Sequence, residues 1–145
     1  MREILFKAKR IDNKEWVEGF LFETQENTYI AYDKQFDDDL FLSPQNIFIC
    51  IDKDTLCQST GLTDKNGNKI WENDICRYID EDENGIKEET FVVKYGRHAE
   101  LFDINMGFYI DWIKTNYYRC DLVFWTENRN IEVIGNVFDN TELLN

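Results

Sequence analysis

The two residues whose spacing best suggests chemistry are Glu72 and Asp74, a pair of carboxylates beside Trp71. Paired carboxylates can act as general acid and base. Two positions apart on a strand they share one face, and they follow a turn. An Asp just before a strand commonly accepts backbone N–H bonds from that turn. We therefore expect structural roles here and predict no catalytic residue, with a small hydrolase kept as an alternative.

Four cysteines and a single histidine, His98, are the other reactive side chains. The cysteines are Cys50, Cys57, Cys76 and Cys120. No two of them form the close pairs that are typical of a zinc site. A Cys–His nucleophile would need His98 beside a thiol, whereas we expect His98 to be a surface loop residue. The pattern predicts neither a metal nor a cofactor, and free thiols that behave as small core hydrophobes.

The segment Asp64-Lys65-Asn66-Gly67-Asn68 invites comparison with a calcium loop. Such a loop starting at Asp64 needs Gly at its sixth position and Glu at its twelfth, where this chain has Lys69 and Ile75. The segment is better explained as a polar hairpin tip. Asn-Gly favours a type I′ turn, in which both central residues have positive φ.

Composition and charge limit the classes of partner. The chain has 145 residues, 43% of them apolar and 15% aromatic, which is enough for one stable core. Its 29 acidic and 16 basic residues give a formal net charge of −13. Direct binding to nucleic-acid phosphates is therefore unfavourable. Without a membrane-length apolar run or a secretion signal at the N-terminus, the chain is expected in the cytoplasm.

Short apolar alternations separated by turn signals predict a mainly β fold, either a small barrel or a meander. Asp37, Asp38 and Asp39 predict a solvated loop, and residues 80–85 predict the acidic tip of a hairpin. Residues 101–113 suit helix or strand, and their β-branched and aromatic content favours strand. Asn140 is expected to cap one terminal helical turn. The expected strands are residues 2–10, 16–22, 28–32, 47–51, 75–79, 90–95, 101–113, 122–125 and 131–134.

Three motifs spread along the chain resemble the YopX family of phage and prophage proteins. The chain opens Met-Arg-Glu-Ile, carries a central signature over residues 58–75, and closes with Ile-Glu-Val-Ile-Gly-Asn over residues 131–136. Asn73 replaces the family's usual Gly, and Asn is the non-Gly residue that best tolerates positive φ. Thr141 stands where Pro is common. The signature residues, for which we expect structural roles, are Thr60, Gly61, Leu62, Asp64, Asn66, Gly67, Ile70, Trp71, Glu72, Asp74, Ile75, Gly135 and Asn136.

The resemblance implies a single domain over residues 1–145 with two lobes. The hairpin signals predict a β-meander over residues 1–57. The resemblance implies a small SH3-like β-barrel over residues 58–145, which we expect to end in a short helical turn. It also implies an origin in a mobile genetic element and a place in a bacterial cytoplasm. Homo-oligomers are a further option. The family has no established activity, so the resemblance supplies no catalytic residues.

The later half of the chain is rich in aromatic residues, more than a small barrel can bury. Exposed aromatic side chains on such a barrel can bind extended peptides. We expect an interaction patch drawn from Trp71, Tyr95, Tyr109, Trp112 and Trp125. The leading hypothesis is a non-enzymatic module that binds an unidentified host or phage protein. The alternative is an acidic DNA mimic that occupies the basic site of a host nucleic-acid-binding protein.

Overall fold

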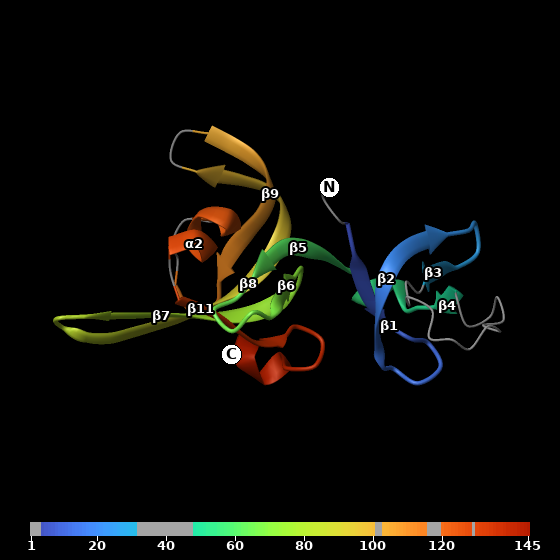
Figure 1. Ribbon diagram of the computed structural model, residues 1–145, viewed down its shortest axis with the longest axis horizontal. Coiled ribbons are helices and arrows are strands. Elements are labelled where there is room, and N and C mark those ends of the chain that lie inside the picture. The colour runs from blue at the N-terminus through green and yellow to red at the C-terminus, as the bar shows by residue number, and fades with distance from the viewer. Residues whose placement is uncertain (1–3, 32–47, 101–102, 116–119, 129) are drawn as a thin grey trace. The chain divides into compact units, whose positions relative to one another are not determined.

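The computed structural model describes residues 4–31, 48–100, 103–115, 120–128 and 130–145 (Figure 1). The fold is mainly β, as predicted, with antiparallel pairing throughout. The chain divides into two compact units, Met1–Ser59 and Thr60–Asn145. We predicted the lobe boundary two residues earlier, after Cys57. The predicted loop around Asp37 to Asp39 lies outside the described residues.

The N-terminal unit is a meander of short antiparallel strands. Its strand order is β4-β3-β2-β1-β5. The sheet curls, because Ile51, just after β4, pairs with Arg10, just after β1. The elements are β1 (Phe6–Lys9), β2 (Trp16–Glu23), β3 (Thr28–Ala31), β4 (Phe48–Cys50), the 3-10 turn η1 (Lys53–Thr55) and β5 (Cys57–Thr63).

Alternating side chains fill the interior of this unit. Ala8, Val17, Ile30 and Ile51 form its buried cluster. Gly19 lies on the same face of β2 as Val17. A methyl group at Gly19 would come within 2.1 Å of the backbone oxygen of Ala31, so β2 and β3 approach too closely there for any side chain.

The C-terminal unit is built on a five-stranded antiparallel sheet in the order β10-β9-β8-β7-β11. β5 continues into this unit and pairs there with β6. The elements of the unit are β6 (Lys69–Trp71), β7 (Asp74–Asp82), β8 (Gly85–Glu100), β9 (Asp103–Trp112), β10 (Cys120–Asp121), α2 (Leu122–Asn128), β11 (Asn130–Asn136) and the 3-10 turn η2 (Thr141–Leu144).

This sheet is open, so the predicted SH3-like barrel is not confirmed. Among the described strands, β10 and β11 lie at opposite edges and do not pair with each other. The physical reason is the length of β8, whose 16 residues extend past the last pair with β9 at one end and past the last pair with β7 at the other. The extra length of β8 forms two-stranded ribbons, and the sheet does not close into a barrel (Figure 1).

Aromatic rings form the centre of the C-terminal core. Phe91 packs edge-on against Trp112 at 5.6 Å, and Trp112 packs against Trp125 at 5.1 Å. Trp125 in turn meets Tyr78 edge-on at 5.1 Å. Edge-to-face contacts at these separations are the favoured arrangement of aromatic pairs. The sheet and α2 are thereby joined through side chains.

Residues 122–125, predicted to be a strand, instead begin helix α2, so this prediction was wrong. The Asp121 carboxylate accepts a hydrogen bond from the Phe124 N–H at 3.2 Å, as an N-cap does. Leu122 is fully buried and Trp125 packs against the core. Their i, i+3 spacing places both on one side of a helix.

The C-terminal helical turn is confirmed as η2, but Asn140 does not cap it with its side chain. The backbone carbonyl of Asn140 accepts a bond from the Leu143 N–H at 3.0 Å. Its side-chain Oδ1 points back to β11 and accepts from the Asn136 N–H at 3.1 Å.

Replacing Gly19 by alanine should destabilise the protein by roughly 3 kcal/mol, the upper part of the range for overpacking. The added methyl group would collide with backbone, which cannot rotate away. Urea unfolding followed by tryptophan fluorescence measures the loss. Glu18→Ala, an exposed neighbour on the same strand, is the control and should change stability little. Equal stability of the two variants would contradict the close approach.

Candidate interaction surfaces

The signature hairpin between β5 and β6 turns at Asp64 to Asn68. The Gly67 N–H donates to the Asp64 carbonyl at 3.0 Å, and the Asp64 N–H donates to the Asn68 carbonyl at 2.8 Å. Gly67 has φ of 82°, whereas Asn66 has no positive φ. The predicted type I′ turn was therefore wrong. The loop is the three-residue form, in which a glycine in the left-handed region follows a type I turn.

The Asp64 carboxylate joins this hairpin to β11. It accepts backbone N–H bonds from Asn66 and Asn68, each at 2.9 Å, and from Val133 at 3.0 Å. The Lys65 N–H also donates to the Ile131 carbonyl at 2.9 Å. Burial acts to raise the pKa of Asp64, but these donors outweigh it and hold the pKa below its ordinary value.

Several signature residues form hydrogen bonds with backbone groups. The Asp74 carboxylate accepts from the Trp71 N–H at 2.8 Å, so the structural role expected for Asp74 is present. Asn73 has φ of 69°, the conformation for which Asn can replace Gly. Its N–H donates to the Val93 carbonyl at 2.7 Å. The Thr60 hydroxyl donates to the Ile70 carbonyl at 2.7 Å.

The remaining signature residues are mostly internal. Ile70, Trp71 and Ile75 are buried, Leu62 packs against the core, Glu72 is half-buried, and Gly61 has φ of 78°.

In the closing motif, the side chain of Asn136 forms hydrogen bonds with the backbone that follows it. Its side-chain oxygen accepts from the N–H groups of Phe138 and Asp139, each at 2.9 Å. A methyl group on Gly135 would come within 2.5 Å of Asn140 Oδ1, so the position has no room for a side chain. The Val137 N–H donates to the Asn73 carbonyl at 3.0 Å, which links the closing motif to the signature.

The five aromatic residues of the expected patch do not share one surface. Trp71, Tyr109 and Trp112 are buried, and Trp125 is packed against the core. Tyr95 is half exposed. Most of the expected patch is therefore core, because the large rings are what fills the space between the sheet and α2.

Other apolar side chains gather around Tyr95 on the distal parts of β8 and β9. We call residues 95–100 and 103–108 the β8–β9 arm, since they lie beyond the last pairs with β7 and β10 (Figure 1). Cross-strand pairing places Tyr95 opposite Phe108 and Arg97 opposite Met106 on one face. On this face Tyr95 is 50%, Ile104 64% and Met106 66% exposed.

His98 is a buried residue of the arm, so its predicted place in a surface loop was wrong. It is 3% exposed, and its ring lies 5.1 Å from that of Tyr109. His98 pairs with Asn105, four positions along β9 from Tyr109, a span of roughly 13 Å on a flat strand. The rings can meet only because the arm curls at the facing glycines Gly96 and Gly107. The apolar face is the convex side.

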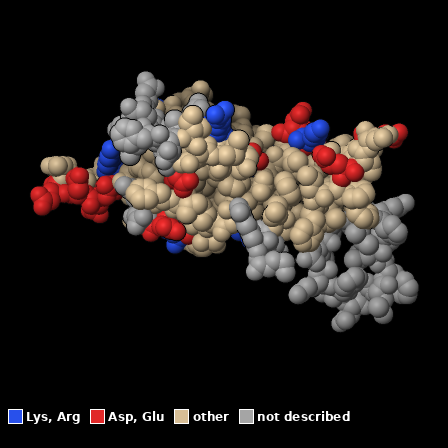
Figure 2. Space-filling model, turned by 90° about the horizontal axis from the view of Figure 1, so that it is seen from above, with Lys and Arg blue, Asp and Glu red and all other residues tan. Residues whose placement is uncertain are grey.

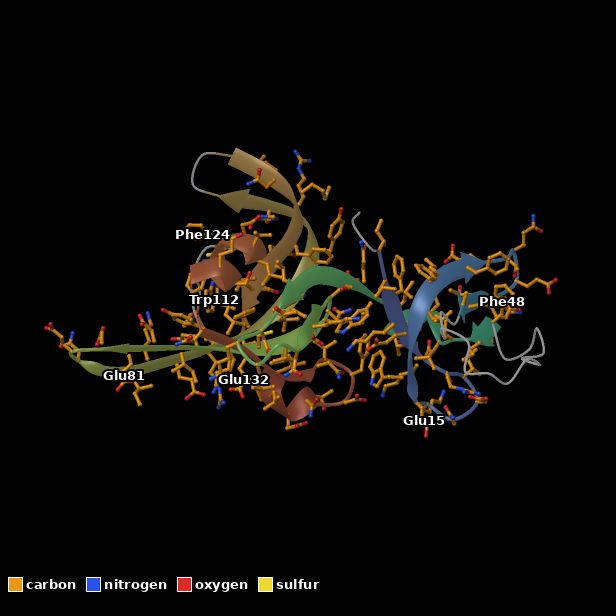
Figure 3. The ribbon with its side chains drawn as sticks, in the orientation of Figure 1. Glu15, Phe48, Glu81, Trp112, Phe124 and Glu132 are labelled. Carbon is orange, nitrogen blue, oxygen red and sulfur yellow. The ribbon has the colours of Figure 1, made fainter. Side chains whose placement is uncertain are left out.

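The distal hairpin of β7 and β8 forms an acidic ribbon, residues 80–89. It lies beyond the pairs that join β7 to β11 and β8 to β9, so it is two-stranded. An Asn-Gly turn closes it, and the Asp82 carboxylate accepts from the Asn84 N–H at 2.7 Å. Figures 2 and 3 show the acidic side chains of this tip, with Glu81 labelled. Six of its residues are acidic and only Lys87 is basic.

Cys76, the thiol closest in sequence to Glu72 and Asp74, is not a reactive nucleophile. Burial raises the pKa of Cys76 well above its ordinary value, and the carboxylates of Asp74 and Asp64 add to the effect. This thiol is protonated at neutral pH and a poor nucleophile. Cys57 is buried and donates to the Thr55 carbonyl, while Cys50 and Cys120 are half-buried.

The N-terminal unit has an open hollow of about 380 Å³ beside the β2–β3 turn. Its walls include Lys14, Glu26 and Asp52. Glu72 and Asp74 are not among its lining residues, so this hollow does not supply the site that a hydrolase using them would need.

The chain is a small β protein. Its signature residues form buried contacts and hydrogen bonds within the fold, and two ribbons, the β8–β9 arm and the acidic ribbon, extend beyond the core. A family model described as YopX protein matches residues 5–145, and the chain belongs to the YopX family. No curated protein matches it. A crystal structure of protein EF1440 from Enterococcus faecalis is similar, with 26% identity, full coverage of both chains and a TM-score of 0.49. Within the described residues no helix is long and apolar enough to span a membrane.

Asp64→Asn should cost about 1–3 kcal/mol, because an amide cannot reproduce all the bonds that the carboxylate accepts from buried N–H groups. Since folding lowers the pKa of Asp64, its contribution is present at neutral pH. The contribution declines as pH falls below about 3.9, the ordinary value for Asp.

Unfolding free energies measured from neutral to acid pH test this. The gap between wild type and Asp64→Asn should narrow in acid. Asp80→Asn, an exposed carboxylate of the acidic ribbon, is the control and should cost little. A gap that is constant with pH would show that the charge of Asp64 contributes nothing.

Proposed function

We propose that this protein is a non-enzymatic binding module, encoded by a mobile genetic element, that contacts another protein in a bacterial cytoplasm. The observation that carries the proposal is the convex face of the β8–β9 arm. Tyr95, Ile104 and Met106 are large apolar side chains, each at least half exposed, on one face of one ribbon. Contiguous exposed apolar surface of this kind is typical of protein-interaction sites.

The arm also suits contact with a partner by its construction. It projects beyond the pairs with β7 and β10, so its convex face is not needed to close the core. Tyr95 packs edge-on against Phe108 at 5.0 Å, which orders the aromatic ring before any partner arrives. Tyr is enriched among the residues that dominate binding energy, and an ordered ring loses little entropy on binding.

The test is affinity capture with the full chain from host and phage-infected lysates, comparing wild type with Ile104→Ser/Met106→Ser. We expect at least one protein to be retained by wild type and reduced about tenfold or more by the double variant, since anchors of this kind are each worth roughly 1–2 kcal/mol. Phe124→Ser is the control, because Phe124 is an exposed apolar side chain of α2 and does not belong to the arm (Figure 3).

Equal retention of every lysate protein by wild type and by the Ile104→Ser/Met106→Ser variant would contradict the proposal. Turnover in an unbiased substrate screen would also contradict it, since a binding module needs no reaction.

The acidic ribbon favours a second candidate function, a decoy that occupies the basic site of a nucleic-acid-binding protein. Its exposed carboxylates lie on a two-stranded ribbon that pairs with no third strand among the described residues. Clustered negative charge speeds encounter with basic surfaces and is screened by salt.

For this candidate, the full chain should compete with a DNA duplex for a basic host protein. Competition should weaken steeply as salt rises from low to physiological concentration. Glu81→Gln/Glu83→Gln should weaken it, whereas Glu15→Gln/Glu26→Gln, an equal charge change in the N-terminal unit, should not. Competition that does not change with ionic strength, or that both double variants weaken equally, would contradict the decoy function.

A further inference from the structure

We infer that the β8–β9 arm binds its partner by accepting an added β-strand along the free edge of β8. The added strand would carry apolar side chains on the face shared with Tyr95 and an acidic residue placed to meet Arg97. This inference rests on the proposed function and specifies the chemistry of the partner. Its three supports are an open backbone edge, a cation without an ion pair among the described residues, and a matching side-chain pattern.

The open edge follows from the pairing register. β8 pairs with β7 as far as Val92, opposite Ile75, and no described strand pairs with β8 on that side farther along. The Val93 carbonyl points to that side, where it accepts the Asn73 N–H. Backbone groups of alternate residues point the same way in a strand, so those of Tyr95 and Arg97 face outward. Outward N–H and C=O groups in a row are the template for strand addition.

The second support is the cation Arg97. Two other cations of this sheet have acidic partners: Arg77 lies 2.5 Å from Glu132, and Lys94 lies 3.4 Å from Asp111. In the part of the chain that the structure describes, Arg97 has no ion pair, although the protein carries a net charge of −13. Its neighbours on the convex face are Tyr95 and Met106.

A partner covering this face would remove the Arg97 guanidinium from water. A buried charge without a counter-charge costs several kcal/mol, so a stable partner must supply a carboxylate there. Arginine pairs well with carboxylates because its planar donors can contact both oxygens. Charge complementarity therefore selects an acidic position in the added strand.

The side-chain pattern suits an extended partner more than a helical one. Tyr95 and Arg97 are two positions apart on β8, and Ile104, Met106 and Phe108 repeat at the same interval on β9. A strand laid beside β8 presents its own side chains at this interval, so each meets a diagonal neighbour on the convex face. Main-chain bonds then provide affinity and the side chains provide specificity.

The test is selection of random peptides displayed on phage against the immobilised full chain. For wild type we expect selected peptides that alternate apolar residues and contain an acidic residue. Arg97→Glu should reverse the preference from acidic to basic at that position. Lys114→Glu makes the same charge change at an exposed site of the C-terminal unit outside the arm, and it should leave the selected pattern unchanged.

Amide hydrogen exchange then reports the backbone contact. With a selected synthetic peptide bound, the N–H groups of Tyr95 and Arg97 should exchange at least tenfold more slowly. An unchanged rate at both, or peptides whose apolar residues repeat at helical spacing, would overturn strand addition. A wild-type dimer in light scattering that Arg97→Glu dissociates would assign the edge to a second copy and also overturn the inference.

Failure here is distinguishable from failure of the proposed function. If the Ile104→Ser/Met106→Ser variant loses a lysate protein but no strand-like acidic peptide is selected, the arm is a binding surface that works by another geometry. If the variant loses nothing, both proposals fall.

Discussion

Much of the C-terminal unit depends on the hydrogen bonds that the Asp64 carboxylate accepts. It accepts N–H groups from its own hairpin at Asn66 and Asn68 and from β11 at Val133. Buried backbone donors need partners, and a carboxylate can satisfy several of them at once. The hairpin tip thereby closes against the edge strand, and β11 in turn pairs with β7 along most of its length. Asn73, Gly135 and Asn136 continue this network of backbone contacts.

β8 is supported by this hydrogen-bond network and extends beyond the core at both ends. Its middle is held between β7 and β9, where Phe91 and Val93 are fully buried. Toward its start it becomes the acidic ribbon, and toward its end it becomes the apolar arm. Segments with few buried contacts open at lower free energy than the core. Because the two ribbons lie outside the signature network, a partner can contact them without disturbing it.

The local turns and most strands could be predicted because their signals are short in range. β2 follows from alternation. The positions of the two hairpins follow from their Asn-Gly dipeptides, although the turn type predicted at Asn66-Gly67 was wrong. Asn73 could be placed at positive φ because it replaces the usual Gly of the family signature and Asn tolerates this conformation. α2 was missed because its apolar residues also suit a strand, although Asp121 and the spacing of Leu122 and Trp125 held a helical signal.

Residue type and order alone determined that this chain is an acidic, mainly β protein of the YopX family, because hairpin signals and motifs are read over a few residues. Only the tertiary structure decided which aromatic rings are core and which side of the arm is exposed. Burial depends on partners distant in sequence: Trp112 is covered by Trp125, and His98 is buried because the arm curls onto Tyr109. The open sheet has the same origin, since closure depends on how far β8 outruns its neighbours and not on any local pattern.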